Sequence, residues 1–146
     1  MKIYLDSCSL QRPFDDKSQI RIALEAEAIL SVIALCETGQ FELLSSEVLI
    51  FETKHIPNIV RRENILEILT LAKKVIMVNN DIENHAINIM RKGIKPLDAL
   101  HLATASHEPA DYFCTSDAVL LKKAKEIEGM NTIAVSPLEL IEEVEK

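Results

Sequence analysis

Short apolar segments alternate with longer segments of helical periodicity along the whole chain, and this alternation limits the fold more than any other feature. Five short segments predict strands, at 2–5, 42–45, 75–78, 112–115 and 132–135. Seven segments with apolar residues every three or four positions predict helices, at 21–37, 46–57, 58–73, 82–91, 96–107, 118–128 and from 136 onward. Residues 11–18, QRPFDDKS, predict a loop. We therefore expect an α/β fold, a three-layer α/β/α sandwich with a central parallel sheet of about five strands.

The length and composition are typical of one globular domain. The chain has 146 residues without a repeat or a linker, so we expect a single domain over residues 1–146. No segment resembles a signal peptide, and no apolar run reaches the roughly 18 residues of a membrane span. The three cysteines form no CxxC motif, which argues against a disulfide framework or a zinc site. We expect a cytoplasmic protein that does not contact a membrane.

The net charge of -7 restricts the choice of partners less than it first suggests. Proteins that bind nucleic acid usually carry a basic surface, because phosphate contacts dominate their affinity. A cluster of carboxylates ringed by basic residues lowers the net charge without excluding such binding. The net charge alone therefore neither favours nor excludes binding to nucleic acid.

Acidic residues stand where several predicted elements begin or end. Asp6 follows the first predicted strand, Asp117 follows the 112–115 strand, and Asp98 lies in the first turn of the 96–107 helix. Open parallel sheets bind ligands outside the carboxyl ends of their strands, where helix N-termini also lie. Glu52, in the helix after the second strand, can reach the same rim. We expect these four carboxylates to converge at one edge of the sheet.

Each acid also has a purely structural interpretation. Asp117 is placed to cap the next helix, Asp98 to complement the dipole of its own helix, and Glu52 to face solvent. Asp6 is harder to explain in this way, because a carboxylate that ends a buried apolar strand needs a partner. Converging carboxylates repel one another and take up protons unless a cation neutralises them. A hard dication, Mg²⁺ or Mn²⁺, suits such oxygen ligands, whereas the absence of Cys/His spacing makes zinc a poor candidate.

Four stretches of the sequence carry these acids in a recognisable order. They are MKIYLDSCSLQRPFDD (1–16), SSEVLIFE (45–52), KPLDALHLATA (95–105) and ADYFCTSD (110–117). Together they resemble the four acidic motifs of the PIN-domain family, over residues 1–135, and within it the VapC-type toxin ribonucleases of type II toxin–antitoxin pairs. The resemblance implies that the catalytic, metal-binding acids are Asp6, Glu52, Asp98 and Asp117. Glu47, in the same motif as Glu52, is the alternative second acid.

Other residues near these motifs have weaker interpretations. Ser7 and Thr115 match small hydroxyl residues that flank the acids in the family and would hold a metal-bound water or a carboxylate. His101 follows the third acid by one helical turn and faces either the cleft or the core. Cys8 and Cys114 are interpreted as buried thiols. Basic residues that either meet phosphates or simply face solvent are Arg12, Lys122, Lys123 and Lys125.

The resemblance implies a Mg²⁺- or Mn²⁺-dependent endoribonuclease that forms a homodimer, with an antitoxin protein as a further partner. Single-stranded RNA suits a small cleft better than a duplex does. The rival interpretation is a PIN-like module that binds RNA or protein without effective cleavage. The acidic charge and the few aromatic residues (two Tyr, four Phe and no Trp) leave it open. A phosphatase is disfavoured, because Ser7 and Cys8 follow Asp6 where a DxD motif is needed.

Overall fold

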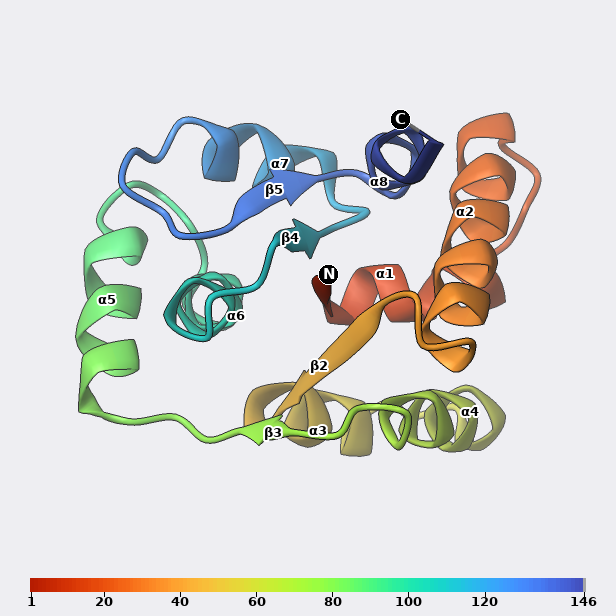
Figure 1. The fold of residues 1–146 in the computed structure, drawn as a ribbon, viewed down its shortest axis with the longest axis horizontal. Helices are drawn as coiled ribbons and strands as arrows, with labels where there is room; N and C mark the ends of the chain where they lie inside the picture. The colour runs from red at the N-terminus through yellow and green to blue at the C-terminus, as the bar shows by residue number, and fades with distance from the viewer. Residues whose placement is uncertain (146) are drawn as a thin grey trace.

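Five parallel strands form the central sheet, in the order β3-β2-β1-β4-β5 (Figure 1). The structure, a computed structural model, describes residues 1–145, and the last residue of the predicted domain, Lys146, lies outside the described residues. The strands are β1 (Lys2–Leu5), β2 (Glu42–Ser46), β3 (Val75–Ile76), β4 (Tyr112–Cys114) and β5 (Ile133–Val135). Every pairing in the sheet is parallel. The predicted α/β fold with a central parallel sheet is therefore confirmed.

Helices cover both faces of this sheet. They are α1 (Ser7–Gln11), α2 (Ile20–Glu37), α3 (Glu47–Lys54), α4 (Ile59–Leu69), α5 (Asn80–Met90), α6 (Pro96–His107), α7 (Ala118–Lys125) and α8 (Pro137–Glu145), with a 3₁₀ turn at Arg12–Phe14. Helices α5 and α6 lie on one side of the sheet, whereas α2 lies on the other and packs against α8 (Figure 1). The result is the expected three-layer arrangement. Within residues 1–145, no helix is long and apolar enough to cross a membrane.

Polar side chains at the ends of loops start most of these helices. Asp6 caps α1, Ser46 caps α3, Asn58 caps α4, Asn79 caps α5 and Asp117 caps α7, each by accepting a hydrogen bond from a backbone N–H of the first turn. Such caps satisfy N–H groups that have no partner within the helix. Two of the acids expected in the site, Asp6 and Asp117, therefore also organise the backbone around it.

The prediction of a loop over residues 11–18 is wrong at its start, and one helix was missed. Helix α1 begins directly after β1, and the 3₁₀ turn at Arg12–Phe14 continues it. Five residues are too few to show helical periodicity, so the capping contact of Asp6 is the only sequence signal for this helix. The consequence is that the chain turns sharply after β1 and keeps Asp6 at the end of the strand.

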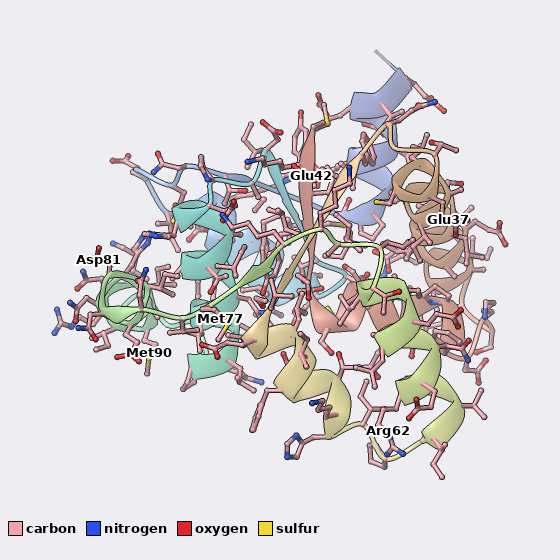
Figure 2. The ribbon with its side chains drawn as sticks, turned by 60° about the horizontal axis from the view of Figure 1, so that its bottom comes forward. Glu37, Glu42, Arg62, Met77, Asp81 and Met90 are labelled. Carbon is pink, nitrogen blue, oxygen red and sulfur yellow. The ribbon has the colours of Figure 1, made fainter. Side chains whose placement is uncertain are left out.

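The core is densest around β1, the middle strand. Ile3, Tyr4 and Leu5 are fully buried, and the ring of Tyr4 stacks on Phe113 of β4 with centroids 5.7 Å apart. Charged side chains such as Glu37 of α2 and Asp81 of α5 point away from the sheet (Figure 2). Apart from the Tyr4 hydroxyl, the buried interior of β1 is therefore apolar.

Candidate active site

Asp6 is a buried carboxylate at the carboxyl end of β1, with 3% of the residue exposed. Its Oδ1 accepts the Ser9 N–H at 2.9 Å, and the Cys8 thiol lies 3.2 Å from both carboxylate oxygens. Burial raises the pKa of Asp6, and hydrogen bonds from Thr115, Ser9 and Cys8 oppose that rise. These contacts hold the carboxylate in place without neutralising its charge, because none of them comes from a lysine or an arginine.

The charges of the other three predicted acids act on the pKa of Asp98. Asp98 lies in the first turn of α6 and is half-buried. Burial raises the pKa of Asp98, and the negative charges of Asp6, Asp117 and Glu52 raise it further. The structure therefore brings the four predicted carboxylates into one electrostatic site at the carboxyl edge of the sheet.

Asp117 has the structural role that its position allows, together with a place in this site. Its Oδ1 accepts the N–H groups of Val119 and Leu120 at 2.9 and 3.1 Å. Its own N–H donates to the Thr115 hydroxyl at 3.1 Å, and that hydroxyl also supports Asp6. The helix-capping interpretation of Asp117 is thus confirmed, but it is not an alternative to the site, since the charge of the capping carboxylate still acts on Asp98.

The second motif presents two glutamates, which point to different neighbours. Oε1 of Glu52 accepts a hydrogen bond from Nε2 of His101. Oε1 of Glu47 instead accepts the Val78 N–H at 2.7 Å, which fastens the segment before α5. Glu52 contributes to the field at Asp98, and Glu47 is not among the groups that shift the pKa of Asp98. The geometry therefore places Glu52, rather than Glu47, beside the other acids.

The hydroxyl and thiol groups near the acids have structural partners. Ser7 accepts a hydrogen bond from Gln11 at 3.0 Å, whereas Thr115 joins Asp6 to the turn that carries the fourth acid. Burial raises the pKa values of Cys8 and Cys114 well above the ordinary thiol range. Cys114 is buried, as interpreted, whereas Cys8 is only partly buried.

Arg12, which follows the first acid in the sequence, is bound by other groups of the protein. Arg12 forms ion pairs with Asp15 at 3.0 Å and with Glu25 at 3.2 Å, and it donates to the Ser116 carbonyl at 3.1 Å. These contacts join the turn after β1 to the turn after β4. The expectation that Arg12 might meet phosphates is therefore not supported, because its guanidinium is already occupied.

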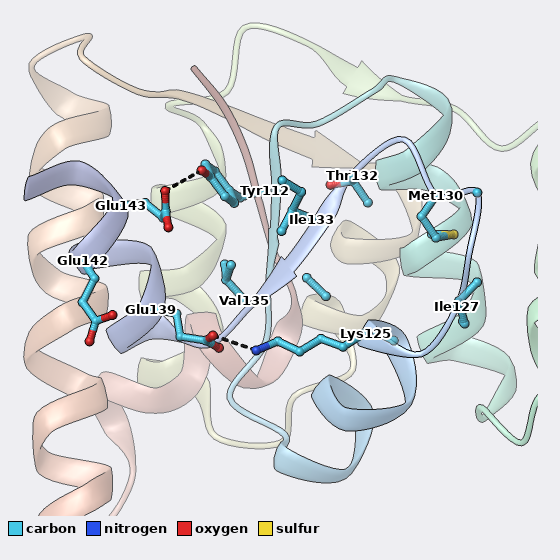
Figure 3. A pocket seen from close by; sticks show the side chains of 13 residues that line it. Tyr112, Lys125, Ile127, Met130, Thr132, Ile133, Val135, Glu139, Glu142 and Glu143 are labelled. Carbon is cyan, nitrogen blue, oxygen red and sulfur yellow. Dashed lines mark hydrogen bonds and ion pairs between the residues drawn. The ribbon is translucent and has the colours of Figure 1, made fainter. Parts of the chain in front are cut away.

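A small cavity of about 180 Å³ adjoins the acids. Asp98 and Asp117 line it on one side, and Lys95 and Lys123 also line it. Nζ of Lys123 donates to the Gly93 carbonyl at 2.8 Å, which holds the ammonium at the cavity wall. A larger cavity of about 510 Å³ lies elsewhere, over β5 and α8 (Figure 3). Size therefore does not identify the site, whereas the combination of carboxylates and lysines does.

The donor set suits a hard dication in chemical type and in charge. Burial and the charges of Asp6, Asp117 and Glu52 raise the pKa of Asp98, and in residues 1–145 no lysine or arginine forms an ion pair with any of these four carboxylates. As the side chains lie, however, the described residues contain no group of three or more His, Cys, Asp or Glu that is close enough to hold a metal ion. Two of the acids are held by other partners, since Asp117 caps α7 and Glu52 is bound to His101.

A parallel α/β sheet with carboxylates at its carboxyl edge is typical of open α/β proteins, whose ligands bind outside the carboxyl ends of the strands. The particular family follows from comparison with known proteins. The PIN domain family matches residues 3–126, so the chain belongs to the PIN domain family. PIN domains are generally nucleases and typically use divalent metals.

Two solved structures share the fold at low sequence identity. VapBC2 from Rickettsia felis, crystallised with a DNA fragment from its promoter, aligns with a TM-score of 0.56 and 16% identity, over 93% of this chain and 98% of that chain. PAE2754 from Pyrobaculum aerophilum aligns with a TM-score of 0.56 and 13% identity, over 99% of this chain and 98% of that chain. A search of the curated proteins found no match. These similarities support the fold, and the roles of the residues rest on their own geometry.

Proposed function

We propose that this protein is a Mg²⁺- or Mn²⁺-dependent endoribonuclease that cleaves single-stranded RNA. The observation that carries the proposal is that Asp98 and Asp117 line one cavity, the Thr115 hydroxyl joins Asp117 to Asp6, and His101, one helical turn after Asp98, binds Glu52. A site with this much uncompensated negative charge needs a cation to approach a phosphodiester. The family assignment supports the same class of reaction.

The four acids would hold the metal, and the chemistry that a bound Mg²⁺ or Mn²⁺ supplies is activation of water and stabilisation of charge on the phosphoryl oxygens. The residues of the chain itself provide the positioning. Asp6 is fixed by the Ser9 N–H and by Cys8. Asp117 is fixed by the first turn of α7. Because these two carboxylates are held by backbone groups, their positions do not depend on the substrate.

The substrate backbone is proposed to pass over the small cavity beside Asp98 and Asp117. Lys95 and Lys123 line this cavity and carry the positive charge that phosphates require. The cavity volume of about 180 Å³ suits part of one nucleotide rather than a duplex. This arrangement supports a splayed single strand as the substrate, since its phosphates can approach the lysines one at a time.

The proposed partners are an antitoxin protein and a second copy of the chain. VapBC2, a structural neighbour, was crystallised with DNA from its promoter. Large apolar side chains are exposed here on α2 and around the junction of α3 and α4, and such surfaces commonly mark interfaces. They are Ile20, Leu24, Leu30, Phe51, Ile59 and Val60. Light scattering at high concentration tests the homodimer, and a monomeric mass contradicts it.

A module that binds without cleaving remains the rival function. The observation that favours it is the spacing of the acids, since the described side chains form no ready group of three metal ligands. In that case RNA or protein binding would persist while cleavage stayed at background with every metal tested. The experiment below separates the two functions.

The decisive experiment measures cleavage of a single-stranded RNA with Mg²⁺, with Mn²⁺ and with EDTA. Wild type is compared with Asp6→Asn and with Asp81→Asn, which makes the same chemical change on the exposed face of α5 (Figure 2). Cleavage is expected to need metal, to disappear in Asp6→Asn and to persist in Asp81→Asn. Asp6→Asn should keep the fold, since asparagine also caps helices well. Equal cleavage by chelated and metal-loaded wild type contradicts the mechanism.

A further inference from the structure

Four polar side chains from four different elements form one hydrogen-bonded chain that ends at Glu52. Ser46 Oγ at the end of β2 lies 2.8 Å from Tyr4 Oη of β1, and Tyr4 Oη lies 2.6 Å from His101 Nδ1 of α6. Nε2 of His101 then reaches Glu52 Oε1 on α3. Ser46, Tyr4 and His101 are at most 1% exposed. Two alternatives were expected for His101, the core or the cleft. The side chain is buried in the core, and it also contacts Glu52, one of the predicted site acids.

One arrangement of the hydrogens matches every donor in this chain to an acceptor. The Leu49 N–H donates to Ser46 Oγ at 3.1 Å, which leaves the Ser46 hydroxyl hydrogen for Tyr4. In this arrangement the Ser46 hydroxyl donates to Tyr4 Oη, and the Tyr4 hydroxyl donates to His101 Nδ1. At the other end, an ionised carboxylate only accepts. Each donor in the chain is thus matched to an acceptor when Nε2 carries the imidazole hydrogen.

We infer that His101 is a positioning residue: through its Nε2–H it holds the Glu52 carboxylate at the acid site, in a tautomer set by Tyr4 and Ser46. This inference deepens the proposed function and rests on it for the role of Glu52. Glutamate has three side-chain torsions and is costly to order. A donor from a rigid, buried ring removes that freedom from Glu52 before any cation or substrate arrives.

The same geometry excludes direct proton exchange between His101 and a substrate. Both ring nitrogens are occupied, Nδ1 by Tyr4 and Nε2 by Glu52. The ring is 1% exposed and packs at 5.7 Å, centroid to centroid, against the ring of Tyr4. Tyr4 in turn stacks on Phe113, so the hydroxyl that sets the tautomer is fixed by the core of the sheet. His101 therefore acts only through Glu52.

Mn²⁺ affinity, measured by electron paramagnetic resonance without RNA, tests this role apart from catalysis. His101→Leu removes the donor, whereas His101→Gln can return an N–H to the same place. His107→Leu, on the exposed end of the same helix, is the matched control. We expect His101→Leu to weaken Mn²⁺ binding by about 10–100-fold, His101→Gln to recover most of that loss, and His107→Leu to bind as wild type does. Unchanged affinity in His101→Leu, or no recovery in a folded His101→Gln, overturns the inference.

The tautomer gives a second test that does not depend on metal or on the folding of the His101 variants. In ¹⁵N spectra of histidine-labelled, metal-free wild type, His101 is expected to show a protonated Nε2 and an unprotonated Nδ1. Tyr4→Phe keeps the stacked ring and loses only the hydroxyl, so it should release the tautomer preference. A protonated Nδ1 in wild type overturns the inference. If wild type neither binds Mn²⁺ nor cleaves RNA while His101 keeps this tautomer, the proposed function fails and the contact to Glu52 stands.

Discussion

Two groups of carboxylates in this molecule experience opposite electrostatic environments. At the carboxyl edge of the sheet, burial and neighbouring negative charges raise the pKa of Asp98, and the acids there have no lysine or arginine partner among the described ion pairs. Over β5, the pKa of Glu139 lies below its usual value, and Glu139 pairs with Lys125 (Figure 3). Partial burial acts to raise this pKa, but Lys125 and Ser136 together lower it by more. The two groups thus differ in whether a basic side chain compensates the charge of the carboxylate.

Acids in both regions also cap helices. Glu139 accepts the Ser136 N–H at 3.0 Å while the Ser136 hydroxyl accepts the Glu139 N–H at 3.1 Å, which is a reciprocal cap at the start of α8. Asp6 and Asp117 cap helices as well, but each also adds charge to the acid site. Capping alone therefore does not distinguish the acids of the two regions, whereas the presence or absence of a basic partner does.

The largest expected difference between the two regions is in cleavage. Asp98→Asn removes one of the four carboxylates and should lower cleavage of single-stranded RNA by at least about 100-fold, the scale of losing one electrostatic contact to a transition state. Glu139→Gln should leave the rate unchanged, because that residue lies over β5 and away from the acids. Single-turnover cleavage assays measure both. Equal losses in the two variants would remove the functional distinction between the regions.

Metal-dependent stabilisation should come next in size. Saturating Mg²⁺ at about 100 times its dissociation constant stabilises a folded protein by about 2.7 kcal/mol, because the ion binds the folded state alone. We expect this stabilisation in wild type and in Glu139→Gln, and little of it in Asp6→Asn. Thermal melting with and without Mg²⁺ measures the shift. A similar increase in Asp6→Asn would place the binding site somewhere other than the acid edge.

The pH dependence of stability should have opposite signs in the two regions. A raised pKa means that the folded state binds more protons than the unfolded state between the two pKa values, so Asp98 lowers the stability of the metal-free protein as pH rises through that window. Asp98→Asn should therefore gain stability relative to wild type from about pH 4 upward. Urea unfolding at several pH values without metal measures the difference. A constant difference between the two proteins contradicts the shift.

The smallest expected effect concerns Glu139. Its lowered pKa contributes stability that is present above the ordinary glutamate pKa and is lost as pH falls through the lowered value. The Lys125 pair is partly exposed, so Glu139→Gln should cost only about 0.2–1 kcal/mol at pH 7 and nothing in strong acid. Glutamine preserves the cap, which isolates the charge. Urea unfolding in low and high salt measures it, and a loss that salt does not reduce contradicts an ion pair.

Much of the fold could be predicted because strand and helix patterns alternate regularly. The carboxyl ends of β1 and β4 then locate Asp6 and Asp117 without further information. The choice between Glu47 and Glu52 could not be made in the same way. Five residues correspond to about 140° around a helix, so the two glutamates face different directions, and only the packing of α3 decides which direction is the site.

The hydrogen-bonded chain to Glu52 was missed for a different reason. A tyrosine in a fully buried strand needs a partner for its hydroxyl, and this signal was present at Tyr4. Its partners, Ser46 and His101, lie 42 and 97 positions away, so sequence distance hides the contact. Helix spacing does place His101 on the same face as Asp98, three residues earlier. That spacing predicts that His101 lies near the acids, but it does not predict that Glu52 is the acid to which His101 is bound.

The double use of Asp6 has a consequence for how the gene can change over generations. As the cap of α1, position 6 tolerates asparagine or serine almost as well as aspartate, since all three accept the same N–H. A mutation to asparagine would therefore leave a folded protein that persists in the cell without the charge that the proposed cleavage needs. Loss of activity at this position carries little penalty in folding, so inactive but intact copies can arise by one substitution and be inherited.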